Sequence, residues 1–129
     1  NVRKGDNIFL IGDLGAGKTF FTRELVKNLG FRDIVNSPSF KLINEYIESE
    51  NDFKILHFDL YRLDDVYEIE YLGWQDYLRS NDICIVEWAE KAKAIWPEKK
   101  FRKEIYFEYA GLNRRKIFIE ENREDKNDK

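Results

Sequence analysis

The sequence predicts an α/β sandwich in which helices cover a mixed parallel and antiparallel sheet. The apolar residues 8–11 lead into a glycine-rich loop and then into a helical pattern, an order of strand, loop and helix that is typical of α/β folds. Residues 40–47 and 53–58 have strand patterns, and the short polar turn between them favours an antiparallel hairpin. Residues 83–86 are apolar throughout, as in a central strand covered on both faces.

The glycine-rich loop has the pattern of a phosphate-binding P-loop. Residues 12–19 read Gly-Asp-Leu-Gly-Ala-Gly-Lys-Thr directly after the first predicted strand. The glycines allow successive backbone N–H groups to converge on a phosphate, Lys18 supplies a cation, and the hydroxyl of Thr19 is a ligand for Mg²⁺. The positive end of the following helix also faces the anion. We therefore expect a nucleotide-binding protein with a three-layer, P-loop NTPase-like sandwich.

Two helices are expected, one after the loop and one in the middle of the chain. Gly30 is a natural C-cap for the first, and the loop at residues 37–39 contains a proline that forces extended backbone. Asp64 and Asp65 can cap the second, which Gly73 is expected to split or bend. The apolar side chains of the first helix recur at helical spacing and are Phe20, Phe21, Leu25, Val26 and Leu29.

The last part of the chain predicts two strands and a tail. The strands cover residues 101–109 and 116–119 and are joined by a turn around residues 111–113, and the polar residues 120–129 are expected to fray. We expect residues 1–119 to form one P-loop domain. Because the chain contains no methionine and reaches its first strand almost at once, we also expect that an N-terminal segment of the natural protein is missing.

The composition limits the class of protein. The 129 residues carry a net charge of −3 and are 43% hydrophobic, which allows a sizeable core and argues against a bulk electrostatic grip on nucleic acid. No apolar run approaches the roughly 20 residues of a membrane-spanning helix, and no signal peptide is visible. We therefore expect a cytoplasmic protein without membrane contact. The single cysteine, Cys84, lies in an apolar run and predicts a buried small hydrophobe.

Two carboxylates follow predicted strands, Asp59 after residues 55–58 and Glu87 after residues 83–86. Ligands of open α/β sheets gather at the carboxyl ends of the strands, so both side chains are placed to act beside Lys18. A metal that bridges phosphates needs acidic ligands, and hydrolysis needs a group that orients water. We expect one carboxylate to serve the metal and the other the water, and the pattern leaves open which does which.

Three further side chains near the expected site have both a functional and a structural interpretation. His57 shares a strand face with Asp59, which can orient it, although a packed and hydrogen-bonded histidine is the preferred interpretation. Trp88 can stack on a ring or shield the site from water, or it can belong to the core. Ser39 carries a hydroxyl in a loop where many nucleotide switches sense the γ-phosphate.

Four ordered segments together resemble one known family. They are residues 12–19, Ser-Pro-Ser-Phe at 37–40 followed by Glu45 and Tyr46, His-Phe-Asp-Leu-Tyr-Arg at 57–62, and Glu-Trp-Ala-Glu at 87–90. In this order and spacing they look like the TsaE (YjeE) family of small bacterial P-loop ATPases. The match covers the chain from about Gly5 to Glu90, and the final hairpin fits less specifically.

The resemblance implies a role in making threonylcarbamoyladenosine beside the anticodon of tRNA. In that family the protein binds a heterodimer of TsaB and TsaD, and its ATP binding and hydrolysis support turnover of that complex, so it acts on tRNA indirectly. The resemblance puts the Mg²⁺ ligands at Thr19 and Glu87 and a catalytic or sensing aspartate at Asp59. It puts the phosphate contacts at Gly15, Ala16, Gly17, Lys18, Thr19 and Phe20.

The chain departs from the family pattern in two ways. The family usually has threonine where Ser39 stands, so the hydroxyl is kept but the stiffening methyl group is lost. The family also carries a segment before the first strand that helps to surround the nucleotide, which we expect to be missing here. On the last hairpin, Arg114 or its neighbour Arg115 is expected to contact the nucleotide.

Two other functions fit a nucleotide site of this kind. A small-molecule or nucleoside kinase also needs an acceptor pocket and an arginine-bearing lid, which residues 64–96 do not clearly supply. A nucleotide-dependent binding module would hold ATP with negligible hydrolysis. A regulatory GTPase is excluded because the Asn-Lys-x-Asp guanine-reading motif is absent. With no arginine finger evident in the chain, we expect a slow ATPase that a partner stimulates.

Overall fold

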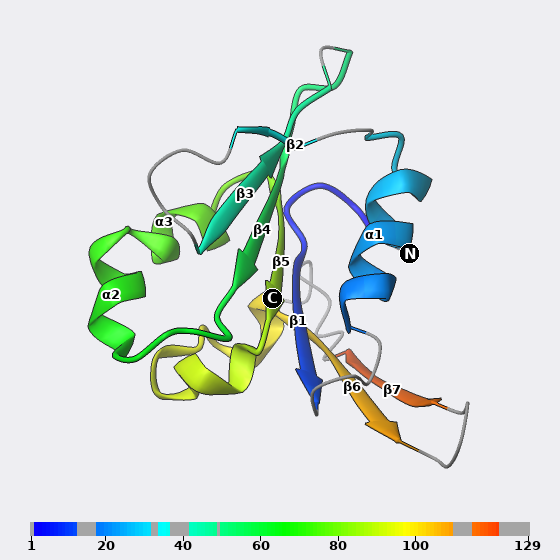
Figure 1. Cartoon of the computed structure of the whole chain (residues 1–129). Coiled ribbons are helices and arrows are strands. Elements are labelled where there is room, and N and C mark those ends of the chain that lie inside the picture. The colour runs from blue at the N-terminus through cyan, green and yellow to red at the C-terminus, as the bar shows by residue number, and fades with distance from the viewer. Residues whose placement is uncertain are drawn as a thin grey trace.

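A seven-stranded sheet with helices on both faces forms the framework of the protein (Figure 1). The computed structural model describes residues 2–12, 18–31, 34–36, 42–48, 50–109 and 115–121. Its strands are β1 (Asn7–Gly12), β2 (Ile34–Asn36), β3 (Ile43–Tyr46), β4 (Ile55–Asp59), β5 (Ile83–Glu87), β6 (Lys103–Tyr109) and β7 (Arg115–Glu121). Its helices are α1 (Lys18–Asn28), α2 (Val66–Tyr71) and α3 (Trp74–Leu78), with 3₁₀ segments η1 (Ala89–Ile95) and η2 (Lys99–Phe101).

The sheet is parallel in its middle and antiparallel at its edges. The strand order is β2-β3-β4-β5-β1-β6-β7. The neighbours β4 and β5, β5 and β1, and β1 and β6 are parallel, whereas β2 with β3, β3 with β4, and β6 with β7 are antiparallel. This confirms the predicted mixed sheet. Because β1, β4 and β5 are parallel, their carboxyl ends meet at one edge of the sheet.

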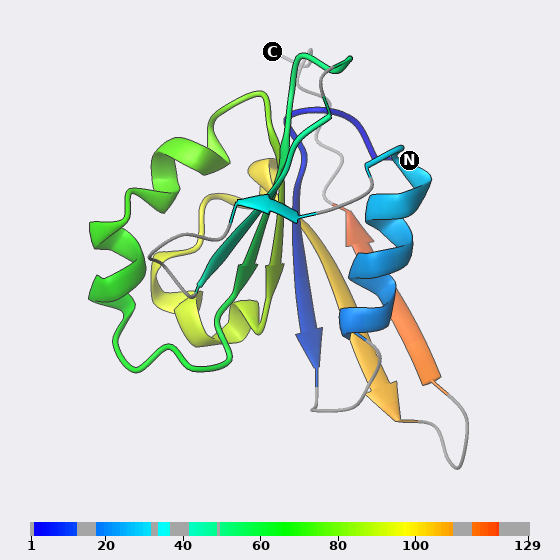
Figure 2. The ribbon, with the colours of Figure 1, turned by 45° about the horizontal axis from the view of Figure 1, so that its top comes forward.

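The apolar core lies on both faces of the sheet. Alternation along β1 sends Phe9 to the face covered by α2, α3 and η1, where its ring stacks on Trp74 with the centroids 6.0 Å apart. Ile8 and Leu10 point to the opposite face and share a cluster with Val26 of α1. Helices therefore form a layer on each side of the sheet (Figures 1 and 2), which confirms the three-layer, P-loop NTPase-like architecture.

The predicted hairpin is confirmed, and the structure adds a strand that the sequence interpretation missed. Asn44 of β3 lies opposite His57 of β4 in an antiparallel pair. β2 then pairs antiparallel with β3, with Ile34 opposite Tyr46 and a register shift further along. Three residues are too few to display an alternating pattern. β2 is therefore defined by its partner strand and not by its own sequence.

The predicted end of α1 at Gly30 is confirmed. Gly30 has a φ of +90°, its N–H donates to the carbonyl of Lys27 at 2.9 Å, and the N–H of Phe31 donates to the carbonyl of Val26 at 3.1 Å. These two bonds are the Schellman pattern that closes a helix. At the other end of α1, Phe20 is 65% exposed, so this side chain lies outside the apolar face that its spacing predicted.

The split of the second predicted helix at Gly73 is also confirmed. Asp65 caps α2, because its side chain accepts a hydrogen bond from the backbone N–H of Tyr67 at 3.0 Å. Gly73 follows α2 with a φ of +79°, in the left-handed region that favours glycine, and α3 begins at the next residue. The change of direction at Gly73 turns α3 so that Trp74 is fully buried.

The two final strands are present with different bounds from those predicted. β6 begins at Lys103, because Phe101 belongs to η2, and β7 extends to Glu121. The two strands pair antiparallel. The turn predicted around residues 111–113 lies outside the described residues.

Cys84 is fully buried in β5, as predicted for a small hydrophobe. Its thiol donates to the carbonyl of Tyr77 at 3.4 Å, and burial raises the pKa of the thiol to about 12, so the group stays protonated at neutral pH. Among the described residues, no helix combines the length and apolar character that crossing a membrane requires.

The close packing of Gly12, the last residue of β1, against β6 predicts that a larger residue there destabilises the protein. Gly12 has a φ of +149°, and a methyl group on its Cα would lie 2.4 Å from the carbonyl oxygen of Phe107 in β6. We expect Gly12→Ala to lower the free energy of unfolding by more than about 1 kcal/mol, because it adds a backbone clash to an unfavourable φ. Gly30→Ala is the matched control, since it changes a glycine with positive φ that has open space around it. Urea unfolding in which Gly12→Ala is as stable as Gly30→Ala would contradict this account.

Candidate functional site

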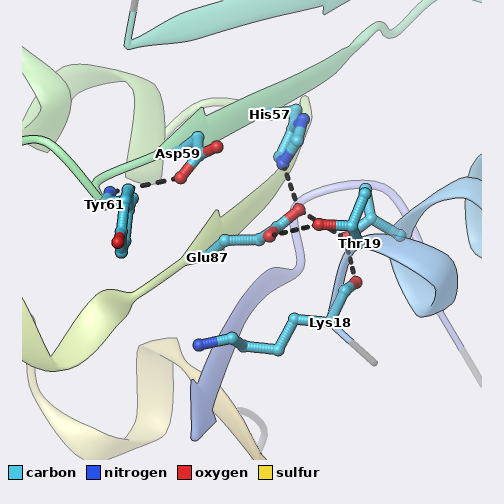
Figure 3. Close-up of polar contacts among 7 residues, drawn as sticks. Lys18, Thr19, His57, Asp59, Tyr61 and Glu87 are labelled. Atoms are coloured by element: carbon cyan, nitrogen blue, oxygen red, sulfur yellow. Dashed lines mark hydrogen bonds and ion pairs between the residues drawn. The ribbon is translucent and has the colours of Figure 1, made fainter. Parts of the chain in front are cut away.

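The carboxylate of Glu87 lies at the centre of the polar site (Figure 3). Glu87 ends β5 and is 2% exposed. The hydroxyl of Thr19 donates to its Oε1 at 3.2 Å, the hydroxyl of Thr22 lies 3.2 Å from its Oε2, and Nε2 of His57 lies 2.7 Å from the same Oε2. Side chains from α1 and from β4 therefore converge on one buried carboxylate.

The surroundings of Glu87 keep it ionised despite its burial. Burial raises the pKa of this carboxyl group, but hydrogen bonds from His57, Thr22 and Thr19, together with the electrostatic effect of His57, outweigh it. The pKa of Glu87 accordingly lies below its ordinary value of 4.5. At neutral pH the site holds a fixed negative charge beside the first turn of α1.

The first turn of α1 contributes two hydroxyl groups. Thr19 and Thr22 are three residues apart and so lie on the same side of the helix. The hydroxyl of Thr22 is also 3.0 Å from the carbonyl of Lys18, so its one proton is shared between that carbonyl and Glu87. Thr19 was predicted to belong to the site, whereas Thr22 was missed. Thr22 could have been found from its spacing, because a residue three positions after Thr19 lies on the same side of a helix.

His57 is buried and hydrogen-bonded, as the preferred interpretation of the sequence held. Its partner differs from the expected one, because Glu87 of the neighbouring strand orients the ring and Asp59 does not. A carboxylate can only accept, so Nε2 of His57 is assigned as the donor. The other ring nitrogen, Nδ1, is buried without a hydrogen-bond partner in the described part of the chain.

Asp59 occupies a different environment from Glu87, although the two are neighbours. They lie opposite each other in the parallel register of β4 and β5. The side chain of Asp59 is only partly buried, and its Oδ1 accepts a hydrogen bond from the backbone N–H of Tyr61 at 3.1 Å (Figure 3). The structure thus brings both predicted carboxylates to one edge of the sheet. Within the described residues, side-chain donors surround Glu87 but not Asp59.

Lys18 and Trp88, both predicted site residues, are in direct contact. Lys18 is 4% exposed, and its ammonium lies 2.5 Å from the carbonyl oxygen of Gly12 and 3.2 Å from the ring centroid of Trp88. Its side chain extends away from Thr19 (Figure 3). Trp88 packs against the core cluster on the α2 side of the sheet, so it serves the core and the site together.

Most of the other residues predicted to contact the nucleotide lie outside the part of the chain that the structure describes. Gly15, Ala16, Gly17, Ser39 and Arg114 lie outside the described residues. Phe20 is described, on the exposed side of α1.

Glu90 is a second residue that the sequence interpretation did not assign to the site. Its Oε2 accepts from the backbone N–H of Gly12 at 3.4 Å, and its Oε1 is buried with no hydrogen-bond partner among the described residues. Glu90 lies three residues after Glu87, at the start of η1. The end of β1 therefore contacts η1 as well as α1.

Comparison with known proteins gives a consistent result over most of the chain. The family described as threonylcarbamoyl adenosine biosynthesis protein TsaE matches residues 1–117. The tRNA threonylcarbamoyladenosine biosynthesis protein TsaE of Haemophilus influenzae is 43% identical over 98 residues, covering 76% of this chain and 61% of that protein. The protein of the same name from Bacillus subtilis is 40% identical over 115 residues, covering 89% of this chain and 69% of that protein. The one from Rickettsia felis is 42% identical over 96 residues, covering 74% of this chain and 54% of that protein.

The ionised Glu87 predicts a specific loss of stability in acid. The pKa of Glu87 is lowered in the folded protein, so the unfolded chain takes up the proton first as the pH falls. Ionised Glu87 contributes its whole share to the free energy of unfolding when the pH is above the pKa that it has in the unfolded chain. This contribution is lost as the pH falls through its lower pKa in the folded protein. We expect urea unfolding without divalent cations to show a smaller loss between about pH 6 and pH 3 for Glu87→Gln than for the wild type.

Glu108→Gln is the matched control for this measurement, because it removes an exposed carboxylate from β6 and changes the net charge equally. If Glu87→Gln and Glu108→Gln lost stability in acid to the same extent as the wild type, the lowered pKa of Glu87 would be wrong.

Proposed function

We propose that this chain, which belongs to the TsaE family of threonylcarbamoyl adenosine biosynthesis proteins, binds ATP with Mg²⁺ at the edge formed by β1, β4 and β5 and hydrolyses it. The family assignment supports involvement in the biosynthesis of threonylcarbamoyladenosine in tRNA. The nucleotide, the metal and the hydrolysis form the proposal. The chain spans 61% of the length of the Haemophilus influenzae relative, so the activity of the whole protein is also part of the proposal.

The observation that carries the proposal is the contact between Thr19 and Glu87. Mg²⁺ prefers oxygen ligands in an octahedron of about 2.1 Å radius, whose neighbouring oxygens are about 3 Å apart. The Thr19 hydroxyl oxygen and Oε1 of Glu87 are 3.2 Å apart, one is neutral, and the other is anionic at neutral pH. This donor pair fits two neighbouring positions around a magnesium ion.

The composition of the site also agrees with magnesium held partly by phosphate. Within the described ranges, no group of three or more histidine, cysteine or acidic side chains is placed to enclose a metal ion. Proteins usually bind Mg²⁺ through one or two side chains, with substrate phosphates and water completing the shell. When bound, the ion would neutralise charge on the phosphates of the nucleotide.

The other site residues have roles that follow from their positions. Lys18 begins α1 and carries a cation, so we assign it to the terminal phosphates, which the positive end of the same helix also attracts. Asp59 lies beside Glu87, and in the part of the chain that the structure describes its donor is the backbone N–H of Tyr61, so its carboxylate is available to accept a proton from water. We therefore assign Glu87 to the metal and Asp59 to the attacking water, which the sequence pattern left open.

The proposed partner is a complex of the TsaB and TsaD type, through which the chain acts on tRNA indirectly. The resemblance to the family supports this partner, and the net charge of −3 disfavours a broad electrostatic contact between this chain and tRNA. If a partner completes the transition-state electrostatics, the isolated chain should hydrolyse ATP slowly.

An ATPase assay with and without the partner tests the proposal as a whole. We expect slow phosphate release from the chain alone and a severalfold higher rate with a TsaB–TsaD pair, because the partner supplies groups that the isolated site lacks. Lys18→Ala should abolish ATP binding and serves as the background control. An unchanged rate, together with no complex formed in ATP, would refute the partnership. Efficient phosphate transfer to a small acceptor would favour a kinase.

A pair of substitutions separates the two carboxylates. Glu87→Gln should weaken ATP binding at least about tenfold in Mg²⁺ and much less in EDTA, because it removes a charged ligand of the metal. Asp59→Asn should lower the hydrolysis rate by about 10²-fold or more and change ATP affinity little, because it removes a proton acceptor.

Isothermal titration and single-turnover hydrolysis measure these two effects, with Glu24→Gln on the exposed side of α1 as a control for charge. Equal loss of affinity for Glu87→Gln with and without Mg²⁺ would contradict the metal role. A normal hydrolysis rate for Asp59→Asn would contradict the role of Asp59 toward water.

A further inference from the structure

We infer that Tyr61 is a positioning residue of this site, which links the cation of Lys18 to the carboxylate of Asp59. The inference rests on the proposed function and adds a residue to it. Tyr61 follows β4 in the segment His-Phe-Asp-Leu-Tyr-Arg, and neither the metal nor the phosphate assignment uses it. Its ring and its backbone contact different parts of the site.

The ring of Tyr61 contacts the tryptophan that holds Lys18. The ring centroids of Tyr61 and Trp88 are 5.1 Å apart with planes inclined at 49°, and the ammonium of Lys18 lies 3.2 Å from the Trp88 centroid. A lysine ammonium over an indole is attracted by the negative face of the ring. The position of the indole therefore helps to fix the position of the ammonium.

Trp88 needs such support because its backbone is strained. It has a φ of +59°, the one positive φ of a non-glycine residue in the described chain. For a bulky side chain the left-handed region is unfavourable, because Cβ lies too close to the backbone carbonyl oxygen. Contacts of the indole with Lys18, with Tyr61 and with the core offset that cost. Removing the Tyr61 ring takes away one of the contacts that hold the indole in place.

The backbone of Tyr61 fixes the other side of the site. Its N–H donates to Oδ1 of Asp59 at 3.1 Å, and its carbonyl accepts from the ammonium of Lys91 in η1 at 2.6 Å. The same ammonium lies 5.6 Å from the Tyr61 ring centroid. Tyr61 is thus held between the end of β4 and η1, and its own position sets that of both Asp59 and Trp88.

These contacts use the ring and the backbone of Tyr61, and the side chain is 45% exposed. Phenylalanine keeps the same ring, so Tyr61→Phe should behave like the wild type. Alanine removes the ring from a partly exposed position, so Tyr61→Ala should still fold. Tyr71 on α2 is 91% exposed, and Tyr71→Ala is the matched control for loss of a surface tyrosine.

The first test measures ATP affinity and single-turnover hydrolysis for these three variants. We expect Tyr61→Ala to raise the Kd for Mg·ATP at least threefold, because the indole that holds the Lys18 ammonium loses a contact. Hydrolysis of the bound ATP should change less, because alanine keeps the backbone N–H that donates to Asp59. Tyr61→Phe and Tyr71→Ala should stay within twofold of the wild type. The inference is overturned if Tyr61→Ala matches Tyr71→Ala, or if Tyr61→Phe fails as Tyr61→Ala does.

A second measurement works without nucleotide. Protons on the terminal methylene of Lys18 lie beside the face of Trp88, so ring currents shift their NMR signal upfield. We expect Tyr61→Ala to move this signal toward that of an ordinary lysine, whereas Tyr61→Phe and Tyr71→Ala keep it shifted. An unchanged signal in Tyr61→Ala overturns the inference. A wild-type protein that binds no ATP would refute the proposed function, and the Lys18 signal would still decide the role of Tyr61.

Discussion

The buried negative charge of Glu87 is the constraint on which the arrangement of the site depends. An ionised carboxylate is costly to remove from water unless donors replace the lost hydration. In this chain the donors come from His57 on the neighbouring strand and from Thr19 and Thr22 on α1. Their convergence fixes the start of α1 against the carboxyl end of β5. The same contacts that stabilise the charge therefore build the candidate site.

The order of the strands makes this convergence possible. β5 lies between β4 and β1, so the end of β5 is flanked by β4, which ends at Asp59, and by β1, which precedes the helix that begins at Lys18. Trp88 comes directly after Glu87 and packs on the core with its indole against Lys18. The end of β5 thus contributes the carboxylate of Glu87 to the site, and the next residue contributes the indole that contacts the Lys18 ammonium.

Much of the fold follows from local patterns, because the relevant signals are contained within single segments. Gly30 and Gly73 mark helix ends through their own backbone conformation, and the run at residues 83–86 indicates a central strand through its composition. β2 was missed because three residues are too few to show the alternation of a strand. Its extended conformation is instead stabilised by pairing with β3. Phe20 fits a helical period, yet its place on the exposed side of α1 depends on how the helix is rotated against the sheet.

The sequence pattern located the two strand-end carboxylates, but it did not reveal their environments and it missed Thr22 and Glu90. Asp59 and Glu87 could be found because each follows a predicted strand, but their different environments arise from side chains distant in sequence. His57 bonds to Glu87 across two strands, and Thr22 reaches it from α1, which no pattern around Glu87 reveals. The phosphate contacts expected at residues 15–17 lie outside the described residues and stay predictions.

The most direct measurement of the central claim is a crystal structure of the protein with Mg²⁺ and a non-hydrolysable ATP analogue. The account predicts a metal ion bound by the Thr19 hydroxyl at about 2.1 Å, with Glu87 as a ligand directly or through one water, and with Lys18 on the terminal phosphate. A nucleotide bound elsewhere, or a metal ion whose ligands include neither Thr19 nor Glu87, would contradict it.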